Sequence, residues 1–220
     1  GSVRRDDGIV KTLWRGVFAL VGLFALGLQY GLMIGTDPGR IAALTLNFFS
    51  FFTILTNVLV MLAMLLPVVA GRTGAGRAMA SPGVRAAVTM YAVVVGLVYH
   101  FLLHATWNPQ GWLYVVNILL HYVMPIAMLI DWLAFVPRRQ LTWRDPARWL
   151  LFPLAYGGWT LIHGFASDWW PYWFVDVSKL GLARTAAYFG GLLIFFLIVG
   201  LVVVAIDRSL PSRDRTLVSA

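Results

Sequence analysis

The sequence contains no cysteine and few charged residues, and both absences narrow what the chain can be. Without cysteine there are no disulfides, no thiolate zinc sites and no cysteine nucleophile, although histidine and carboxylate ligands remain. Only 12% of the 220 residues are charged, whereas 60% are hydrophobic and the mean hydropathy is +0.80. These values lie far outside the average for soluble domains and predict an integral membrane protein. The chain also lacks a soluble basic surface with interleaved aromatic residues, which excludes nucleic-acid binding.

Six segments have the roughly 20 apolar residues that a helix needs to cross a hydrocarbon core of about 30 Å. They cover about residues 11–34, 44–70, 84–106, 112–136, 148–166 and 183–207. We therefore expect an all-α fold, with a single transmembrane domain over residues 1–220 in which six spanning helices form a bundle.

The lysines and arginines indicate which helix ends face the cytoplasm, because short cytoplasmic connections retain positive charge. Fourteen of the 17 basic residues lie in the N-terminal segment, the second and fourth connections or the C-terminal tail. The other three are Arg40, Lys179 and Arg184. This bias predicts that both termini are cytoplasmic in a multi-pass protein of the cell membrane. We therefore interpret the net charge of +8 as a topology signal, and we expect the basic residues also to attract anionic lipids of the inner leaflet.

All the histidines lie inside predicted spans, where an ionisable side chain marks a candidate functional site. They are His100, His104, His121 and His163. A single such histidine is as often structural as functional. Four at overlapping depth in one half of the membrane favour a polar site, because each neutral imidazole needs partners in a medium of low dielectric constant.

The second predicted helix carries a polar face that must look into the bundle. Ser50, Thr53 and Asn57 are spaced by three and four residues and therefore share one side of a helix. Thr53 and His121 each lie nine residues from the outer ends of their helices, which places both about 13 Å below the outer boundary at 1.5 Å per residue. The two side chains can therefore meet. The alternative is a purely structural role, because polar side chains in spanning helices often hydrogen-bond only to one another or to backbone carbonyls.

The outer stretch 167–176 is rich in aromatic residues and is interrupted by a proline. For most of its tryptophans the ordinary interpretation is an aromatic belt at the lipid headgroups. The stretch can also fold back as a lid over the polar cavity. In that arrangement Trp170, Tyr172 and Trp173 would contact a substrate, and Asp176 would hydrogen-bond a histidine.

Two segments carry a recognisable pattern: FFTILTN at residues 51–57 and NILLHYVMP at residues 117–125, the latter followed by Asp131 and Trp132. They resemble the androgen-induced-protein-like family of membrane proteins. The outer segment YWFVD at 172–176 is similar to the family's aromatic segment before its last helix, with Trp173 at the place of an expected proline. The chain looks like a bacterial branch of this family, which implies placement in a bacterial inner membrane.

The resemblance implies a fold of six helices and a threonine hydrolase that cleaves fatty acid esters of hydroxy fatty acids without a cofactor or metal ion. Carried over by motif, the nucleophile is Thr53 and the base is His121, the pair that depth brings together. A threonine hydroxyl becomes an effective nucleophile when a base removes its proton, and an acyl-enzyme follows. Bacterial members can have a different substrate from animal ones.

Such chemistry also needs a donor for the oxyanion and a partner that orients the base. We expect the donor to be an amide of Asn57 or Asn117, since backbone N–H groups in the middle of a helix are already bonded. Candidates to orient His121 are Asn117, His100 and Asp176. The full set of supporting candidates is Asn57, Asn117, His100, His163 and Asp176, and the candidate substrate contacts are Ser50, His104, Trp170, Tyr172 and Trp173.

The competing interpretation is a histidine-based metal or proton site in a transporter-like or lipid-binding protein without hydrolase activity. Against zinc, only His100 and His104 have ligand spacing on one helix, and the glutamate of the metalloprotease helix is missing between them. Against a carrier, the chain lacks a mid-span carboxylate coupled to an ion and a convincing internal repeat. Asp131 is expected to pair with Arg138 or another interfacial arginine rather than to react.

Overall fold

The computed structural model describes residues 2–211, and in this part of the chain the regular structure is entirely helical, with 83% helix and no strand. The α-helices are α1 (Ser2–Ile34), α2 (Ile41–Phe48), α3 (Phe52–Val69), α4 (Gly74–Ala80), α5 (Pro82–Val98), α6 (Trp112–Ile118), α7 (Met124–Phe135), α8 (Asp145–Trp149), α9 (Leu151–Ser167), α10 (Val177–Leu180) and α11 (Leu182–Ser209). Short 3-10 turns are η1 (Pro38–Arg40), η3 (His104–Thr106) and η5 (Trp173–Val175), and π-helical turns are η2 (Tyr99–Leu103) and η4 (Leu119–Val123). The predicted all-α class is confirmed.

Five helices of the described chain are long and apolar enough to cross a membrane. They are Gly8–Ile34, Phe52–Val69, Pro82–Thr106, Trp112–Phe135 and Leu182–Ser209. Large apolar side chains of α1 point outward, for example Leu13, Val17 and Leu20 with 62%, 54% and 68% of their surface exposed. A lipid-facing surface has this composition, and these observations support a membrane protein.

Two of the six predicted spans differ from the structure. Segment 148–166 is divided at Leu150 into α8 and α9, and α9 has 17 residues. Segment 44–70 is not one helix, so the prediction of a continuous helix there is wrong. It is divided into α2 and α3 by a turn at Phe49–Phe51, and α3 begins at Phe52.

Contacts from α9 hold the turn between α2 and α3 in place. The Tyr156 hydroxyl donates to the Ser50 carbonyl at 2.9 Å, and the Trp159 indole N–H donates to the Ser50 hydroxyl at 2.9 Å. The Ser50 hydroxyl in turn donates to the Leu46 carbonyl at 2.7 Å. The turn therefore places Ser50 outside α3 and Thr53 in the first turn of α3, rather than both on one continuous helical face.

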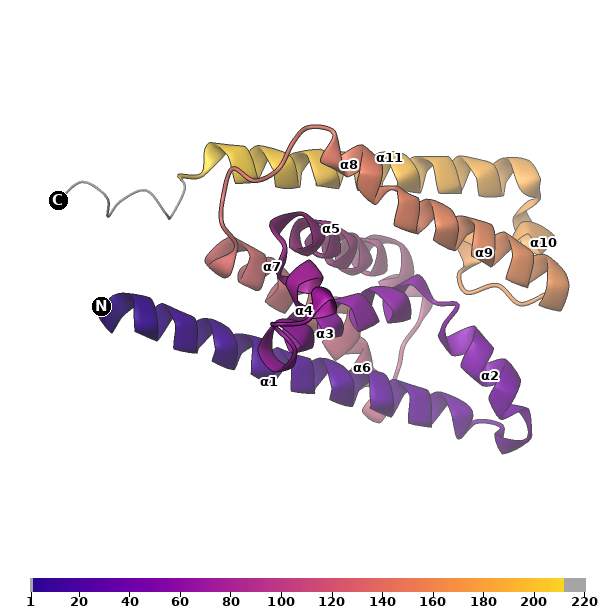
Figure 1. Cartoon of the computed structure of the whole chain (residues 1–220). Coiled ribbons are helices and arrows are strands. Elements are labelled where there is room, and N and C mark those ends of the chain that lie inside the picture. Colours follow the sequence, from indigo (N-terminus) through magenta and orange to yellow (C-terminus); the bar gives the residue numbers. More distant parts are fainter. Residues whose placement is uncertain (1, 212–220) are drawn as a thin grey trace.

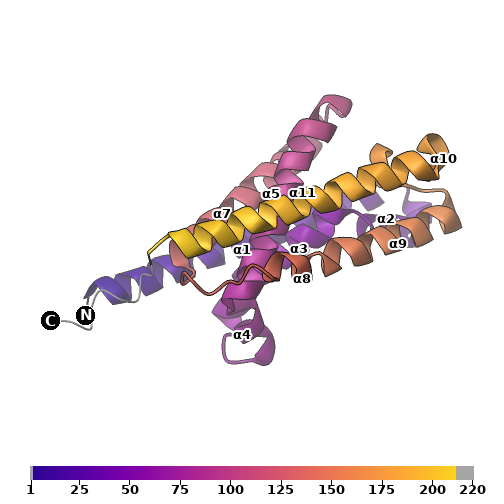
Figure 2. The same ribbon diagram turned by 90° about the horizontal axis from the view of Figure 1, so that it is seen from above.

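The helices cross one another around α3, α5 and α7 (Figures 1 and 2). The start of α1 and the end of α11 lie at one end of the molecule, whereas α2 and α10 lie at the opposite end. One core cluster packs α5 against α7, α8 and α11 through side chains such as Tyr91, Trp132 and Phe196. A second packs α1, α3 and α7 through Val60 and Met128 among others. The basic tail residues Arg213 and Arg215 lie outside the described residues.

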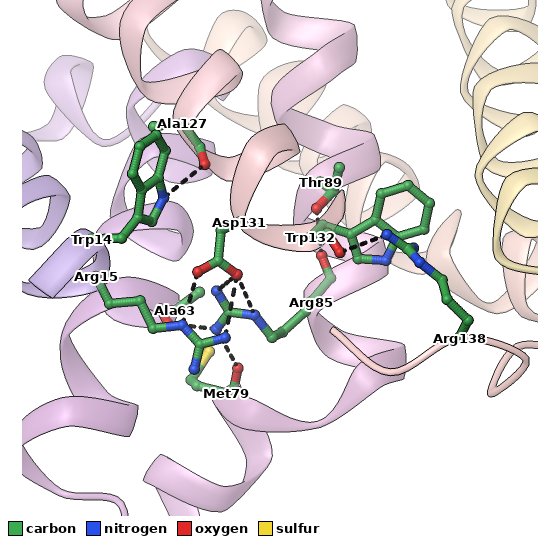
Figure 3. A network of polar contacts seen from close by, with 10 residues as sticks. All are labelled: Trp14, Arg15, Ala63, Met79, Arg85, Thr89, Ala127, Asp131, Trp132 and Arg138. Carbon is green, nitrogen blue, oxygen red and sulfur yellow. Dashed lines mark hydrogen bonds and ion pairs between the residues drawn. The ribbon is translucent and has the colours of Figure 1, made fainter. Parts of the chain in front are cut away.

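Asp131 is completely buried and makes ion pairs with two arginines from other helices (Figure 3). Its Oδ1 lies 2.8 Å from Nε of Arg15 in α1, and its Oδ2 accepts hydrogen bonds from Nε and Nη2 of Arg85 in α5. The predicted partner Arg138 has other contacts: it donates to the carbonyls of Trp132 and Leu133 at 3.0 and 2.6 Å. Asp131 therefore joins three helices inside the protein instead of pairing at the interface with Arg138.

Candidate active site

The structure brings Thr53 and His121 together. Thr53 Oγ1 lies 3.4 Å from His121 Nε2, so that the first turn of α3 faces the π-helical turn η4. Thr53 is buried, with 9% of its surface exposed. Catalytic hydrogen bonds are often this long without substrate and shorten in the complex. Among the four histidines, His121 is the one that contacts this threonine.

The backbone of Asn117 and the ring of Tyr99 orient His121. Its Nδ1 lies 3.0 Å from the Asn117 carbonyl oxygen, and its ring stacks on Tyr99 at a centroid distance of 4.0 Å. An Nδ1–H that donates to this carbonyl leaves Nε2 with a free lone pair toward Thr53, as a base requires. The Asn117 amide also donates to the Tyr99 hydroxyl at 2.6 Å. Asn117 was one of the orienting candidates, whereas sequence reasoning missed Tyr99, which by pattern is an ordinary core aromatic.

The backbone N–H of Thr53 is not bonded to a helical carbonyl. It donates instead to the Tyr172 hydroxyl at 3.2 Å, and Tyr172 also lies 3.4 Å from Thr53 Oγ1. The first N–H groups of any helix have no intrahelical partner, and they carry the positive end of the helix dipole. The expectation that backbone N–H groups at Thr53 are already used in mid-helix is wrong, because α3 begins at Phe52.

The two asparagines proposed as oxyanion donors are both engaged elsewhere. The amide nitrogen of Asn57 donates to the Thr53 carbonyl and to the Leu120 carbonyl, each at 2.9 Å. These two hydrogen bonds use both N–H groups of the Asn57 amide. The amide of Asn117 is directed to Tyr99. The available donors beside Thr53 are therefore its own N–H and the hydroxyl of Tyr172.

No protein-family model, curated protein or solved structure matches this chain. The possible chemistry of the site therefore follows from the side chains and backbone groups that form it. They comprise a hydroxyl within reach of an oriented imidazole, a helix N-terminus at the same hydroxyl, and a phenol that touches both the backbone and side chain of Thr53.

The aromatic stretch lies over the start of α3. Phe51 makes edge contacts with Trp169 and Tyr172 at centroid distances of 5.3 and 5.8 Å. Trp170 packs against Gly164 of α9, and the Trp173 indole lies 3.5 Å from the Leu102 carbonyl. Of the three aromatic residues predicted to contact substrate, Tyr172 reaches Thr53.

The remaining histidines do not join His121. His163 is buried between Trp159 and Trp169, at centroid distances of 5.6 and 5.2 Å. His100 is exposed, and its Nδ1 lies 3.0 Å from the Tyr122 hydroxyl, with the exposed His104 ring 6.0 Å away. Within residues 2–211, no three histidine or carboxylate side chains come together in a group that could hold a metal ion. The single cluster of four histidines expected from their depth is not formed.

Asp176 caps α10 and does not bond a histidine in the described structure. It accepts from the backbone N–H of Lys179 at 3.3 Å and from the Ser178 hydroxyl, and it lies 3.1 Å from the Lys179 ammonium. Burial raises the pKa of Asp176, but these hydrogen bonds and the nearby ammonium together lower it by more than burial raises it. The pKa therefore lies below its usual 3.8.

An apolar cavity of about 230 Å³ opens beside Thr53. Its wall is formed by α5, α9 and α11 with the aromatic stretch, and it includes Thr53, Tyr99, Tyr172, Gly157 and Phe189. This volume is about that of eight water molecules in the liquid, at roughly 30 Å³ each. Because a methylene group has a similar size, the cavity suits a segment of hydrocarbon chain beside Thr53.

Proposed function

We propose that the protein is an intramembrane lipid-ester hydrolase in which Thr53 is the nucleophile and His121 the base. The observation that carries this proposal is the contact of 3.4 Å between Thr53 Oγ1 and His121 Nε2 at the edge of an apolar cavity. The similarity of segments 51–57 and 117–125 to the androgen-induced-protein-like family supports the same assignment.

The reaction proceeds in two halves. His121 Nε2 accepts the hydroxyl proton of Thr53 while Oγ1 attacks the ester carbonyl, and the carbonyl electron pair moves to the oxygen. The resulting imidazolium then donates its proton to the departing alkoxide, which leaves an acyl-threonine. Water, deprotonated by the same imidazole, then attacks this ester. The imidazolium returns the proton to Thr53 Oγ1 as the C–O bond breaks, which releases the fatty acid and restores both groups.

The oxyanion is stabilised by the donors at the start of α3. When a substrate carbonyl oxygen takes the present place of the Tyr172 oxygen, it accepts the Thr53 N–H, and the phenol can turn to donate as well. Loss of one such donor typically reduces the rate by about 10²–10³-fold. The turn that starts α3 at Phe52 is therefore part of the catalytic arrangement.

The substrate is proposed to be a fatty acid ester, with fatty acid esters of hydroxy fatty acids as the first class to test. Its acyl chain occupies the cavity between α5, α9 and α11. We further propose that the protein lies in a bacterial inner membrane, with both termini cytoplasmic and with α9 as the sixth spanning helix. A helix of 17 residues is about 26 Å long, near the lower limit for a span.

The test is hydrolysis of a panel of fatty acid esters by purified protein. Thr53→Ala and His121→Ala are each expected to lose at least about 10³-fold in kcat, as removal of a nucleophile or base does in other hydrolases. Thr56→Ala, in the same helix and also buried, is the matched control and is expected to retain activity.

Thr53→Ser is expected to retain part of the activity, because the hydroxyl remains. Wild-type turnover in either alanine variant, with all proteins monodisperse, would refute the nucleophile and base assignment. Absence of hydrolysis across the panel in the wild type would refute the proposed activity.

A further inference from the structure

A second pocket, of about 340 Å³, lies where the start of α1 meets the end of α3 and the α4 region. The charged residues in its wall are Lys11, Arg15 and Arg77, and no carboxylate of the described chain lines it. We infer that this pocket binds the phosphate group of an anionic phospholipid.

The first argument is the charge balance of the buried network. Arg15 and Arg85 share the single carboxylate of Asp131, and the three residues expose 6%, 0% and 0% of their surfaces (Figure 3). Among the side chains that the structure describes, this network therefore holds one more positive than negative charge where water is scarce, and such a charge is unfavourable without a counter-charge. Arg15 belongs both to this network and to the wall of the pocket, so an anion in the pocket lies beside the unbalanced charge.

The second argument is the type and placement of the donors. Arg77 lines the pocket and donates one N–H to the Arg72 carbonyl at 2.5 Å, which restrains its guanidinium and leaves its other N–H groups for a ligand. The planar fork of a guanidinium fits two phosphate oxygens, and the ammonium of Lys11 adds a mobile point charge. Basic pockets between spanning helices are a recurring way to hold lipid headgroups.

The surroundings of the pocket favour a lipid over free phosphate. Pro67 and Val68 of α3 line the pocket, and Val68 and the adjacent Val69 expose 38% and 67% of their surfaces. Acyl chains attached to a bound phosphate can lie along this apolar surface. The pocket adjoins the last turn of α3, whereas Thr53 is in the first turn, so the inference is independent of the proposed hydrolysis.

The experiment is native mass spectrometry of the full chain in a neutral detergent with added phosphatidylglycerol, phosphatidic acid or phosphatidylcholine, and separately with inorganic phosphate. The test variant is Lys11→Gln with Arg77→Gln. The control is Arg139→Gln with Arg144→Gln, which removes the same charge from exposed residues outside the pocket. Melting temperatures of both variants check that the fold is kept.

We expect the wild type to retain the anionic lipids in preference to phosphatidylcholine. The pocket variant should bind them about 25-fold more weakly, from roughly fivefold for each of the two cations removed. The control should change by less than about threefold. Equal losses in both variants would reduce the effect to general charge attraction and overturn the inference. So would the absence of any lipid preference, or inorganic phosphate that binds at the same site as well as the lipids do.

Discussion

Replacement of Asp131 by asparagine is expected to destabilise the protein strongly. The substitution preserves the shape of the side chain but removes the carboxylate that pairs with the guanidinium groups of both Arg15 and Arg85. Arg85 is also held by its hydrogen bonds to the carbonyls of Ala63 and Met79, so it cannot easily withdraw to water. Removal of one partner from a buried ion pair costs roughly 3–5 kcal/mol. For a chain of this size that corresponds to a fall in melting temperature of about 6–20 °C.

The assay is thermal unfolding in detergent, followed by tryptophan fluorescence, with Asp145→Asn as the matched control. Asp145 pairs with an exposed arginine, Arg148, and such a pair contributes about 0–1 kcal/mol. The triple variant Arg15→Leu, Arg85→Met, Asp131→Leu should be more stable than Asp131→Asn, because no charge is left unpaired. Melting of Asp131→Asn within about 2 °C of Asp145→Asn would refute this account of the network.

Two further substitutions test the packing of α11 and the cap of α10. Gly200→Val should cost about 1–3 kcal/mol, because a Cβ there would lie 2.9 Å from Met90 Sδ, whereas Gly191→Val, with no neighbour within 4 Å, should be nearly neutral; equal melting temperatures would contradict the close approach. Asp176→Asn should lower the free energy of unfolding at neutral pH. This difference in stability from wild type should vanish as the pH falls through the depressed pKa of the Asp176 carboxyl, because its bonds stabilise the fold only when it is ionised. A stability difference that persists at pH 2 would show that the cap does not depend on charge.

The helical class and the main long helices were predictable because they depend on local composition. A run of apolar residues is visible in sequence whatever it packs against, and five such runs form long helices in the structure. The contact between Thr53 and His121 was expected from equal depth in two continuous helices, but α3 begins at Phe52, so the rise per residue along segment 44–70 does not explain why the two side chains meet.

The turn before α3 was not predictable, because residues 48–52 contain no proline or glycine to mark it. The contacts that hold this turn come from Tyr156 and Trp159, more than 100 residues away in the chain. The partners of Asp131 were missed for the same reason, since Arg15 and Arg85 are 116 and 46 residues distant whereas Arg138 is near in sequence. Tertiary contacts of this kind leave no periodic signal.

The amide of Asn57 limits how two helices of the candidate site can move relative to each other. It holds the carbonyls of Thr53 and Leu120 at once, so that α3 and the helix carrying His121 are fastened together at the level of the site. A slide of one helix past the other by a single turn, about 5.4 Å, would break this fastening before the two reactive groups could separate. These two helices are thus held in a fixed position relative to each other. If the protein is the proposed hydrolase, we expect the segment that holds Tyr172, rather than these helices, to move when a substrate enters.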